Sequence, residues 1–345
     1  MAANRYKGYS KLGPYCNMGG YPGHSRLIVE SNCQAVLAVQ DLAFLIDLAS
    51  KLPETIFVYK GWHHPATDGS PMNDDVQRWG AYSDPIGAAR AWVHSTRPYV
   101  ENIPLEYRNR FYVNISNEFA DWENLDKMVA FETEATRLLY LETGIGTAAG
   151  NFAVGTPESE GARGQEIHQK LITLWEALIQ YHGVYNVHEY FAWRPSVYRG
   201  PNQDDALSMG VFIDPEFDQY TRTAWHIGRI ERVYANYISH YTPELKVVIG
   251  EMGAGAALGG MGIDRYFGGP SNTWRDNVPR LKQLFPDQDP YQMHLNDLIK
   301  CDNVYKALPY VIGAFVYTAT DIEDSGFNIT PILPQFYDYI KSQNT

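Results

Sequence analysis

Eight short apolar runs recur along the chain, and most are followed by a segment with helical spacing. The runs consist largely of Val, Ile, Phe, Tyr and Ala without alternating charge, as expected of strands that are buried on both faces. They cover residues 9–17, 34–39, 55–62, 110–117, 146–154, 184–192, 246–251 and 311–320. Helical spacing predicts helices over residues 41–51, 85–100, 125–143, 165–182, 222–241, 293–308 and 333–342.

A strand followed by a helix, repeated eight times, is typical of a (β/α)8 barrel. We therefore predict a single TIM-barrel catalytic domain spanning residues 1–345. The first unit is the weakest, because glycines interrupt residues 19–23 and its helix, near residues 25–31, is short. An open, doubly wound sheet is the alternative. Such a sheet would be expected to carry a phosphate-binding glycine fingerprint near its first turn, and the sequence has none.

Two predicted connections are unusually long, residues 193–220 after the sixth strand and residues 252–289 after the seventh. Long loops inside compact domains are usually binding elements or lids. Both follow the carboxyl ends of strands, which is the face on which barrel enzymes place their sites. The pattern therefore predicts that the substrate binds beside these two loops.

The composition fits a folded globular chain and excludes two kinds of partner. Hydrophobic residues make up 45% of the chain and charged residues 20%, which leaves little room for long disorder. The formal net charge is -12, and no Lys/Arg cluster could replace condensed counterions, so we predict no nucleic-acid partner. We predict no membrane partner either, since no stretch approaches the roughly 18 apolar residues of a span. The N-terminus lacks an apolar signal core, and the compartment and oligomeric state stay open.

The three cysteines give no sign of a disulfide framework or a metal site. Cys16, Cys33 and Cys301 form no C-x-x-C motif and leave one thiol over in any pairing scheme. A reducing compartment or incidental thiols fit this pattern best. Aromatic residues say more, because they make up 14% of the chain and many fall in predicted loops, where flat rings could stack on sugars rather than fill the core.

Two glutamates stand where separate apolar runs finish: Glu118 directly follows the fourth run, and Glu251 is the last residue of the seventh. A carboxylate is costly to desolvate where a buried strand ends, so two of them suggest a paired acid/base site. If their oxygens lie roughly 5 Å apart, one can attack an anomeric carbon while the other protonates the leaving oxygen. A gap of about 6.5–9.5 Å would instead admit a water and invert the centre. The bland alternative is two surface salt bridges, and Glu158 is a rival carboxylate in a setting more typical of a helix start.

These strand ends resemble the retaining glycoside hydrolases of clan A, a superfamily of barrels that includes cellulases, mannanases and β-galactosidases. The resemblance rests on Asn117-Glu118 at the fourth strand and Glu251 at the seventh. It implies that Glu118 is the acid/base, that Asn117 binds the sugar 2-hydroxyl and that Glu251 is the nucleophile. Members commonly carry His-x-Tyr in strand six with the tyrosine bonded to the nucleophile, which here matches His188 and Tyr190. Two residues apart in a strand, these side chains share a face.

The chain departs from the family pattern at two places. In the eighth run Phe315 and Tyr317 share a face near the position where the clan usually has a tryptophan under the sugar, so Tyr317 is the expected replacement. Many members also carry an arginine near the end of strand two, whereas residues 38–41 read Ala-Val-Gln-Asp. The subfamily is therefore open, and we expect a divergent one.

Other aromatic and histidine residues are candidates for contact with the saccharide. Trp62 ends the third run and His63 follows it, and Trp193 directly follows the His-x-Tyr run, so all three are expected to line the mouth of the barrel. Trp274 lies in the predicted seventh loop and is a candidate for stacking on a sugar ring.

The preferred hypothesis is a retaining glycosidase that cleaves a β-linked oligo- or polysaccharide without a cofactor or a metal. Glu118 would hold a proton at the start of the cycle, and Glu251 would stay ionised with the help of a hydroxyl such as that of Tyr190. One alternative is a metal-dependent barrel hydrolase using His63, His64, His188 and Asp321, although the first run lacks the H-x-H that such enzymes generally carry. A barrel that binds carbohydrate without turning it over is the other alternative.

Overall fold

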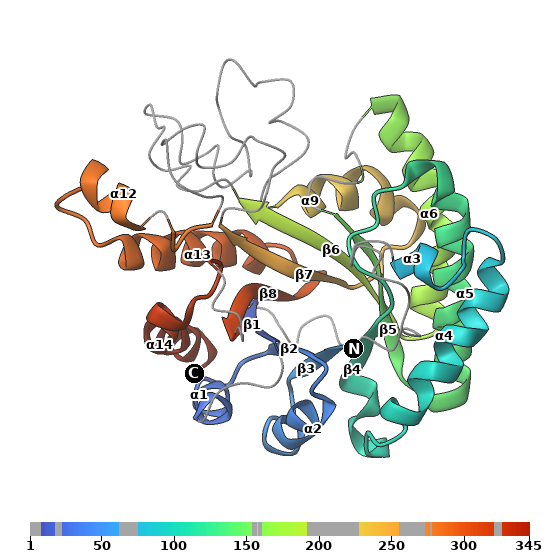
Figure 1. Cartoon of the computed structure of the whole chain (residues 1–345), viewed down its shortest axis with the longest axis horizontal. Coiled ribbons are helices and arrows are strands. Elements are labelled where there is room, and N and C mark those ends of the chain that lie inside the picture. Colours follow the sequence, from blue (N-terminus) through green and yellow to red (C-terminus); the bar gives the residue numbers. More distant parts are fainter. Residues whose placement is uncertain are drawn as a thin grey trace.

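Eight parallel strands close into a barrel in the order β1 to β8, with β8 paired to β1. The structure is a computed structural model and describes residues 8–17, 23–61, 75–153, 157, 161–191, 228–254, 273–276, 278–320 and 326–345. Figure 1 shows the helices arranged around the outside of the strands. Closure of the sheet confirms the predicted (β/α)8 barrel and rules out the open, doubly wound alternative.

Strands and helices alternate along the chain. The strands are β1 (Leu12–Asn17), β2 (Ala35–Val39), β3 (Ile56–Lys60), β4 (Phe111–Asn114), β5 (Gly146–Phe152), β6 (Val184–Phe191), β7 (Val247–Ala254) and β8 (Val311–Thr320). The helices are α1 (His24–Glu30), α2 (Leu42–Lys51), α3 (Asp75–Arg78), α4 (Pro85–Val100), α5 (Leu125–Thr143), α6 (Gly161–Gln180), α9 (Arg229–Val233), α10 (Ser239–Tyr241), α12 (Val278–Leu284), α13 (Pro290–Lys306) and α14 (Leu333–Asn344). A π-helical turn, η4 (Tyr234–Ile238), joins α9 to α10, and 3-10 turns cover η1 (Leu105–Arg110), η2 (Trp122–Asn124) and η5 (Thr330–Ile332).

Some predicted boundaries are wrong near the site. β4 ends at Asn114 instead of residue 117, because only residues 112–114 pair with β5. β7 runs on to Ala254, three residues past Glu251, because residues 251–254 still pair with the long strand β6. The predicted loop over 252–289 is therefore too long, and it also contains the helix α12. The predicted loop over 193–220 lies outside the described residues.

The core consists of two apolar layers, one inside the barrel and one between the barrel and its helices. In β2, Ala35, Leu37 and Val39 belong to a cluster made of strand residues, whereas Val36 and Ala38 belong to the larger cluster that includes the helices. This alternation follows from the two-residue period of a strand. The inner cluster is Tyr15, Ala35, Leu37, Val39, Ile56, Val58, Ala148, Val184, Val248, Ile312 and Phe315, and it lies below the polar side chains at the carboxyl ends of the strands.

The cysteines and the helices bear on two further predictions. Cys16, Cys33 and Cys301 are buried free thiols, which agrees with the absence of a disulfide framework in the sequence. Across the residues that the structure describes, no helix combines the length and the apolarity that a membrane crossing requires.

Stability should fall in mild acid because His24 is buried at the packing of α1 on α14. Its Nε2 lies 2.6 Å from the hydroxyl of Tyr337, and burial lowers the pKa of His24 to about 4. The pKa of a histidine in the unfolded chain is about 6.5. Between pH ~6.5 and ~4 the unfolded chain therefore binds a proton at His24 that the folded chain does not, so the free energy of unfolding decreases as the pH falls. We expect this group to remove about 2–3 kcal/mol of unfolding free energy between pH ~7.5 and ~4.5.

Urea unfolding at several pH values measures this effect. His24→Gln should be less stable than the wild type at neutral pH but lose less stability on acidification. An equal loss in both proteins would show that His24 is not the group responsible.

Candidate active site

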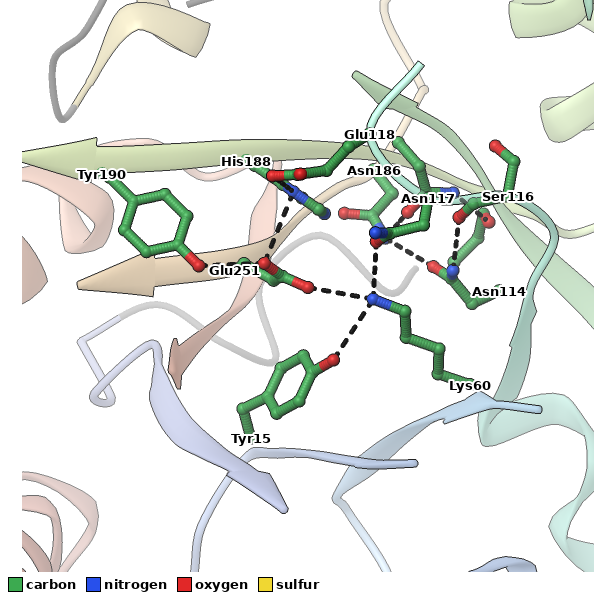
Figure 2. A network of polar contacts seen from close by, with 12 residues as sticks. Tyr15, Lys60, Asn114, Ser116, Asn117, Glu118, Asn186, His188, Tyr190 and Glu251 are labelled. Atoms are coloured by element: carbon green, nitrogen blue, oxygen red, sulfur yellow. Dashed lines mark hydrogen bonds and ion pairs between the residues drawn. The ribbon is translucent and has the colours of Figure 1, made fainter. Parts of the chain in front are cut away.

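Polar side chains from several strands, or from the turns after them, meet at the carboxyl end of the barrel (Figure 2). The set comprises Tyr15 from β1, Lys60 from β3, Asn117 and Glu118 after β4, His188 and Tyr190 from β6, Glu251 from β7 and Tyr317 from β8. One oxygen of Glu118 and one of Glu251 lie within 4.8 Å of each other. The two glutamates singled out in the sequence therefore face each other across the barrel mouth rather than forming separate surface salt bridges.

Glu251 is buried, and each of its carboxylate oxygens accepts a hydrogen bond. Lys60 Nζ lies 2.9 Å from Oε1, and the Tyr190 hydroxyl donates to Oε2 at 2.9 Å. Burial raises the pKa of Glu251, but the charges of Lys60 and His188 and the hydrogen bonds from Lys60 and Tyr190 outweigh it and bring the pKa down to about 2. Glu251 is therefore an anion at neutral pH, as a nucleophilic carboxylate must be.

Of the two tyrosines beside Glu251, Tyr190 donates a hydrogen bond to its carboxylate, and the Tyr15 hydroxyl oxygen accepts one from Lys60. Burial raises the pKa of Tyr15 and of Tyr190 well above the usual range, and the negative charge of Glu251 raises both further. Both hydroxyls consequently keep their protons near neutral pH. The protonated phenol of Tyr190 can therefore stabilise the carboxylate of Glu251 as a hydrogen-bond donor.

A bulge at Gly250 turns Glu251 into the barrel. Val187 pairs with Ile249 and His188 pairs with Glu251, so Gly250 is an extra residue in β7. Simple alternation from Val248, which lies in the inner cluster, would point Glu251 outward, and the extra residue reverses this. A Cβ at Gly250 would stand 2.2 Å from Asn186 Oδ1, so the bulge needs glycine here.

Lys60 is the charged residue of the site that the sequence analysis missed, and Tyr15 beside it was missed as well. Ile56 and Val58 belong to the inner cluster, and Lys60 is next in the same alternation, so its buried side chain also points into the barrel. That alternation is the signal that could have identified it. Lys60 places a cation on Glu251 from β3, the strand next to β2, where this chain lacks the arginine that many clan members carry.

The Lys60 ammonium connects three groups of the site. Besides Glu251 Oε1, it donates to Asn117 Oδ1 at 2.6 Å and to the Tyr15 hydroxyl oxygen at 3.2 Å. With its oxygen bound to Lys60, the Asn117 side chain has its Nδ2 donors left to offer to a ligand, as far as the described part of the chain is concerned. A sugar hydroxyl oxygen is a suitable acceptor for them.

Glu118 lies in a turn beyond β4 and has an unusual backbone. It lies four residues beyond the end of β4 at Asn114 rather than directly after the strand, and its φ is 47°, in the left-handed region that non-glycine residues seldom adopt. Its side chain is 30% exposed, whereas that of Glu251 is 9% exposed. The two carboxylates therefore occupy different environments, one open to the barrel mouth and one enclosed.

His188 and Tyr190 share the inner face of β6, as predicted, and Glu189 points outward to the backbone N–H groups of Gly228 and Ile230. His188 Nδ1 lies 3.5 Å from Glu118 Oε1 and 3.7 Å from Glu251 Oε2. The imidazole therefore sits between the two acids.

Glu118, His188 and Glu251 also offer three ligand atoms within 4.8 Å of one another, a spacing that a divalent cation could use. The ammonium of Lys60, 2.9 Å from Glu251, opposes a second cation at this position. The other proposed ligands of a metal-dependent hydrolase, His63, His64 and Asp321, lie outside the described residues.

Aromatic rings from β1, β6 and β8 form one wall of the site. The ring of Tyr317, which is half-buried, packs edge-on at 4.9 Å from Tyr15 and at 6.4 Å from Tyr190. Phe327, which the sequence analysis did not single out, stands 5.6 Å from Tyr317. Phe315 is fully buried in the inner cluster, so Tyr317 rather than Phe315 is available to a ligand.

The remaining candidates from the sequence divide into two groups. Trp62, His63 and Trp193, together with the rival carboxylate Glu158, lie outside the described residues. Trp274 is described, and the prediction that it stacks on a sugar is wrong. Its side chain is buried, its ring stacks on His294 at 4.3 Å, and its Nε1 donates to the carbonyl of Phe327.

Comparison with known proteins finds similarity in structure but not in sequence. No protein-family model and no curated protein matches the chain. A solved endoglucanase structure matches over 98% of this chain and 99% of its own, with a TM-score of 0.50 and 8% identity. The catalytic domain of a mannanase from Streptomyces sp. SirexAA-E matches over 93% and 78%, with a TM-score of 0.45 and 13% identity. Cellulose synthase subunit Z from Clostridioides difficile matches over 95% and 99%, with a TM-score of 0.47 and 11% identity. The endoglucanase match shows that this chain has the barrel fold of a glycoside hydrolase, which is the fold that the resemblance of its strand ends implies.

Proposed function

We propose that this protein is a retaining glycoside hydrolase that cleaves a β-linked saccharide by double displacement. The observation that carries the proposal is the pair Glu118 and Glu251, whose nearest oxygens lie within 4.8 Å. Retaining enzymes hold their carboxyl groups about 5–5.5 Å apart, whereas inverting enzymes need about 6.5–9.5 Å to fit a water between them. The shared barrel fold with an endoglucanase supports a saccharide substrate, and the β-linkage follows from the resemblance to clan A.

In the first step Glu251 would attack the anomeric carbon. The bond from that carbon to the leaving oxygen breaks, and Glu118 gives its proton to that oxygen. The electrostatics suit these roles, since Glu251 is already ionised with a pKa near 2 and needs no base to activate it. Asn117 would donate to the 2-hydroxyl from the amide nitrogen that Lys60 leaves available.

In the second step a water would replace the leaving group. Once Glu251 is esterified it no longer carries a charge, and Glu118, now deprotonated, takes a proton from the water as it attacks the anomeric carbon. The C–O bond to Glu251 breaks, and its carboxylate returns to Lys60 and Tyr190, the groups that stabilise it in the resting protein. Two inversions give net retention.

The stereochemistry of the product tests the proposal. A panel of aryl β-glycosides should reveal a substrate, and proton NMR of the early reaction should show the β-anomer of the released sugar. The matching 2-deoxy-2-fluoro glycoside, with an activated leaving group, should add one sugar to the peptide that contains Glu251. An initial α-anomer, or a label on another residue, would contradict the assignment.

A further inference from the structure

A second buried glutamate lies behind the site, on the helix side of the barrel. Glu132 of α5 has no exposed surface, although a glutamate is seldom fully buried unless it is paired. Its Oε1 accepts a hydrogen bond from the Ser116 hydroxyl at 2.5 Å, and its Oε2 accepts one from the Gly150 N–H at 2.7 Å. One carboxylate thus joins the turn after β4 to the upper end of β5.

Both of the segments that Glu132 joins have a backbone that needs support. Glu118 has a φ of 47°, and in β5 Gly150 and Asn151 have φ values of 104° and 37°. Conformations in this region persist when the surrounding structure holds them. Gly150 has no room for a side chain, because a Cβ would lie 2.6 Å from the ring of Tyr185.

The two segments also hold each other beside Glu118. The Phe119 N–H donates to the Asn151 carbonyl at 3.0 Å, and the Ala153 N–H donates to the Phe119 carbonyl at 3.2 Å. Glu118 therefore lies between Ser116, which is bound to Glu132, and Phe119, which is bound to the strand that Glu132 also holds. Glu132 therefore holds the turn directly at Ser116 and, through β5, on the side of Phe119.

We propose that Glu132 is a positioning residue that fixes the general acid Glu118 at the distance from which it protonates the leaving oxygen. The inference rests on the proposed function, and it assigns to a residue with no contact to the substrate an effect on one chemical step. A carboxylate suits this position because both partners are donors and each takes one of its oxygens. The Gly150 N–H can only donate, so a glutamine must turn its oxygen to Gly150 and its NH2 group to Ser116.

The dependence of the rate on the leaving group tests the proposal. A dinitrophenolate leaves without protonation, whereas an unsubstituted phenol needs the acid. Glu132→Gln and Ser116→Ala should lower kcat/KM for the phenyl glycoside about 10- to 100-fold, because a displaced acid loses most of its effect. For the dinitrophenyl glycoside the loss should be less than about 3-fold, since that step does not use the acid. Ser116→Ala removes one hydrogen bond only, so it decides the matter if Glu132→Gln does not fold.

Asp302 provides a matched control at the other end of the barrel. It is equally buried, and it accepts from the Lys11 N–H and the Tyr339 hydroxyl, both at 2.7 Å. Asp302→Asn should lower the thermal midpoint of unfolding and leave the ratio of the two kcat/KM values unchanged. An equal loss on both substrates in the Glu132 and Ser116 variants, or no loss, overturns the role of Glu132 while leaving the glycosidase proposal intact. If the wild type cleaves neither substrate nor any glycoside of the panel, both proposals fail.

Discussion

Replacing Glu251 by glutamine is expected to lower kcat on every glycoside that the wild type cleaves by about 1,000-fold or more. The amide has nearly the same volume as the carboxylate, and its oxygen can still accept from Tyr190 or Lys60. It cannot act as the nucleophile, however, so the covalent intermediate does not form. Steady-state kinetics on an activated aryl glycoside, with circular dichroism to verify folding, measure this loss.

Glu118→Gln should behave differently from Glu251→Gln, and this contrast distinguishes the two roles. Without the acid, an activated leaving group still departs and the glycosyl-enzyme forms. Its hydrolysis is slow because no base activates the water, so the intermediate accumulates and both kcat and KM fall. A small anion such as azide, which needs no base, should restore turnover in Glu118→Gln and give a glycosyl azide, but not in Glu251→Gln. If both variants keep more than about a tenth of the wild-type rate, the assignment of the two acids is wrong.

The sequence predicts the elements of the barrel well because residues close to each helix end determine where that helix begins or ends. The predicted bounds of α4 and α5 agree with the structure. At the start of α4 the Asp84 side chain accepts from the Gly87 N–H with Pro85 as the first helical residue, and α5 ends before Gly144 in the left-handed conformation. Such caps can be read from a few neighbouring residues.

The features that the sequence did not yield depend on how neighbouring strands pair. The last paired residue of β4, Asn114, is set by β5, and the bulge at Gly250 is set by β6, so neither can be read from its own segment. Two-residue alternation alone would even have turned Glu251 away from the site. The resemblance to a family pointed to two acids that the structure brings within 4.8 Å of each other, although the reason that Glu251 faces inward is visible only in the register.

Lys60 and Trp274 show the same limit for single side chains. In the sequence alone, Lys60 at the end of a strand has the pattern of a solvated charge, and only the closed barrel places it beside Glu251. The glycine-rich segment around Trp274 led to the prediction that its ring stacks on a sugar, whereas in the structure the ring stacks on the buried His294. In each case the deciding contact lies more than a few residues away along the chain.

Replacing Lys60 by methionine is expected to move the acid limb of kcat/KM to higher pH by about 1 to 3 units. Burial would still raise the pKa of Glu251, whereas the largest of the opposing causes, the charge of Lys60, would be gone. In the wild type Glu251 stays ionised down to a pH near 2, so activity between pH ~4 and ~6 does not depend on its protonation. In Lys60→Met, activity should fall as the pH drops through the raised pKa, which a pH profile of kcat/KM detects.

The conservative variant Lys60→Arg separates charge from packing. Arginine keeps the positive charge but has a planar fork that fits the contacts to Asn117 and Tyr15 less well. Lys60→Arg should therefore keep the acid limb at low pH while its kcat falls.

Lys60→Met should also be destabilised at neutral pH by about 3–5 kcal/mol, because it leaves the carboxylate of Glu251 buried without its partner. Protonation of Glu251 relieves that penalty, so the difference in unfolding free energy from the wild type should shrink as the pH falls. An acid limb that stays in place in Lys60→Met would mean that Tyr190 and His188 suffice to keep Glu251 ionised.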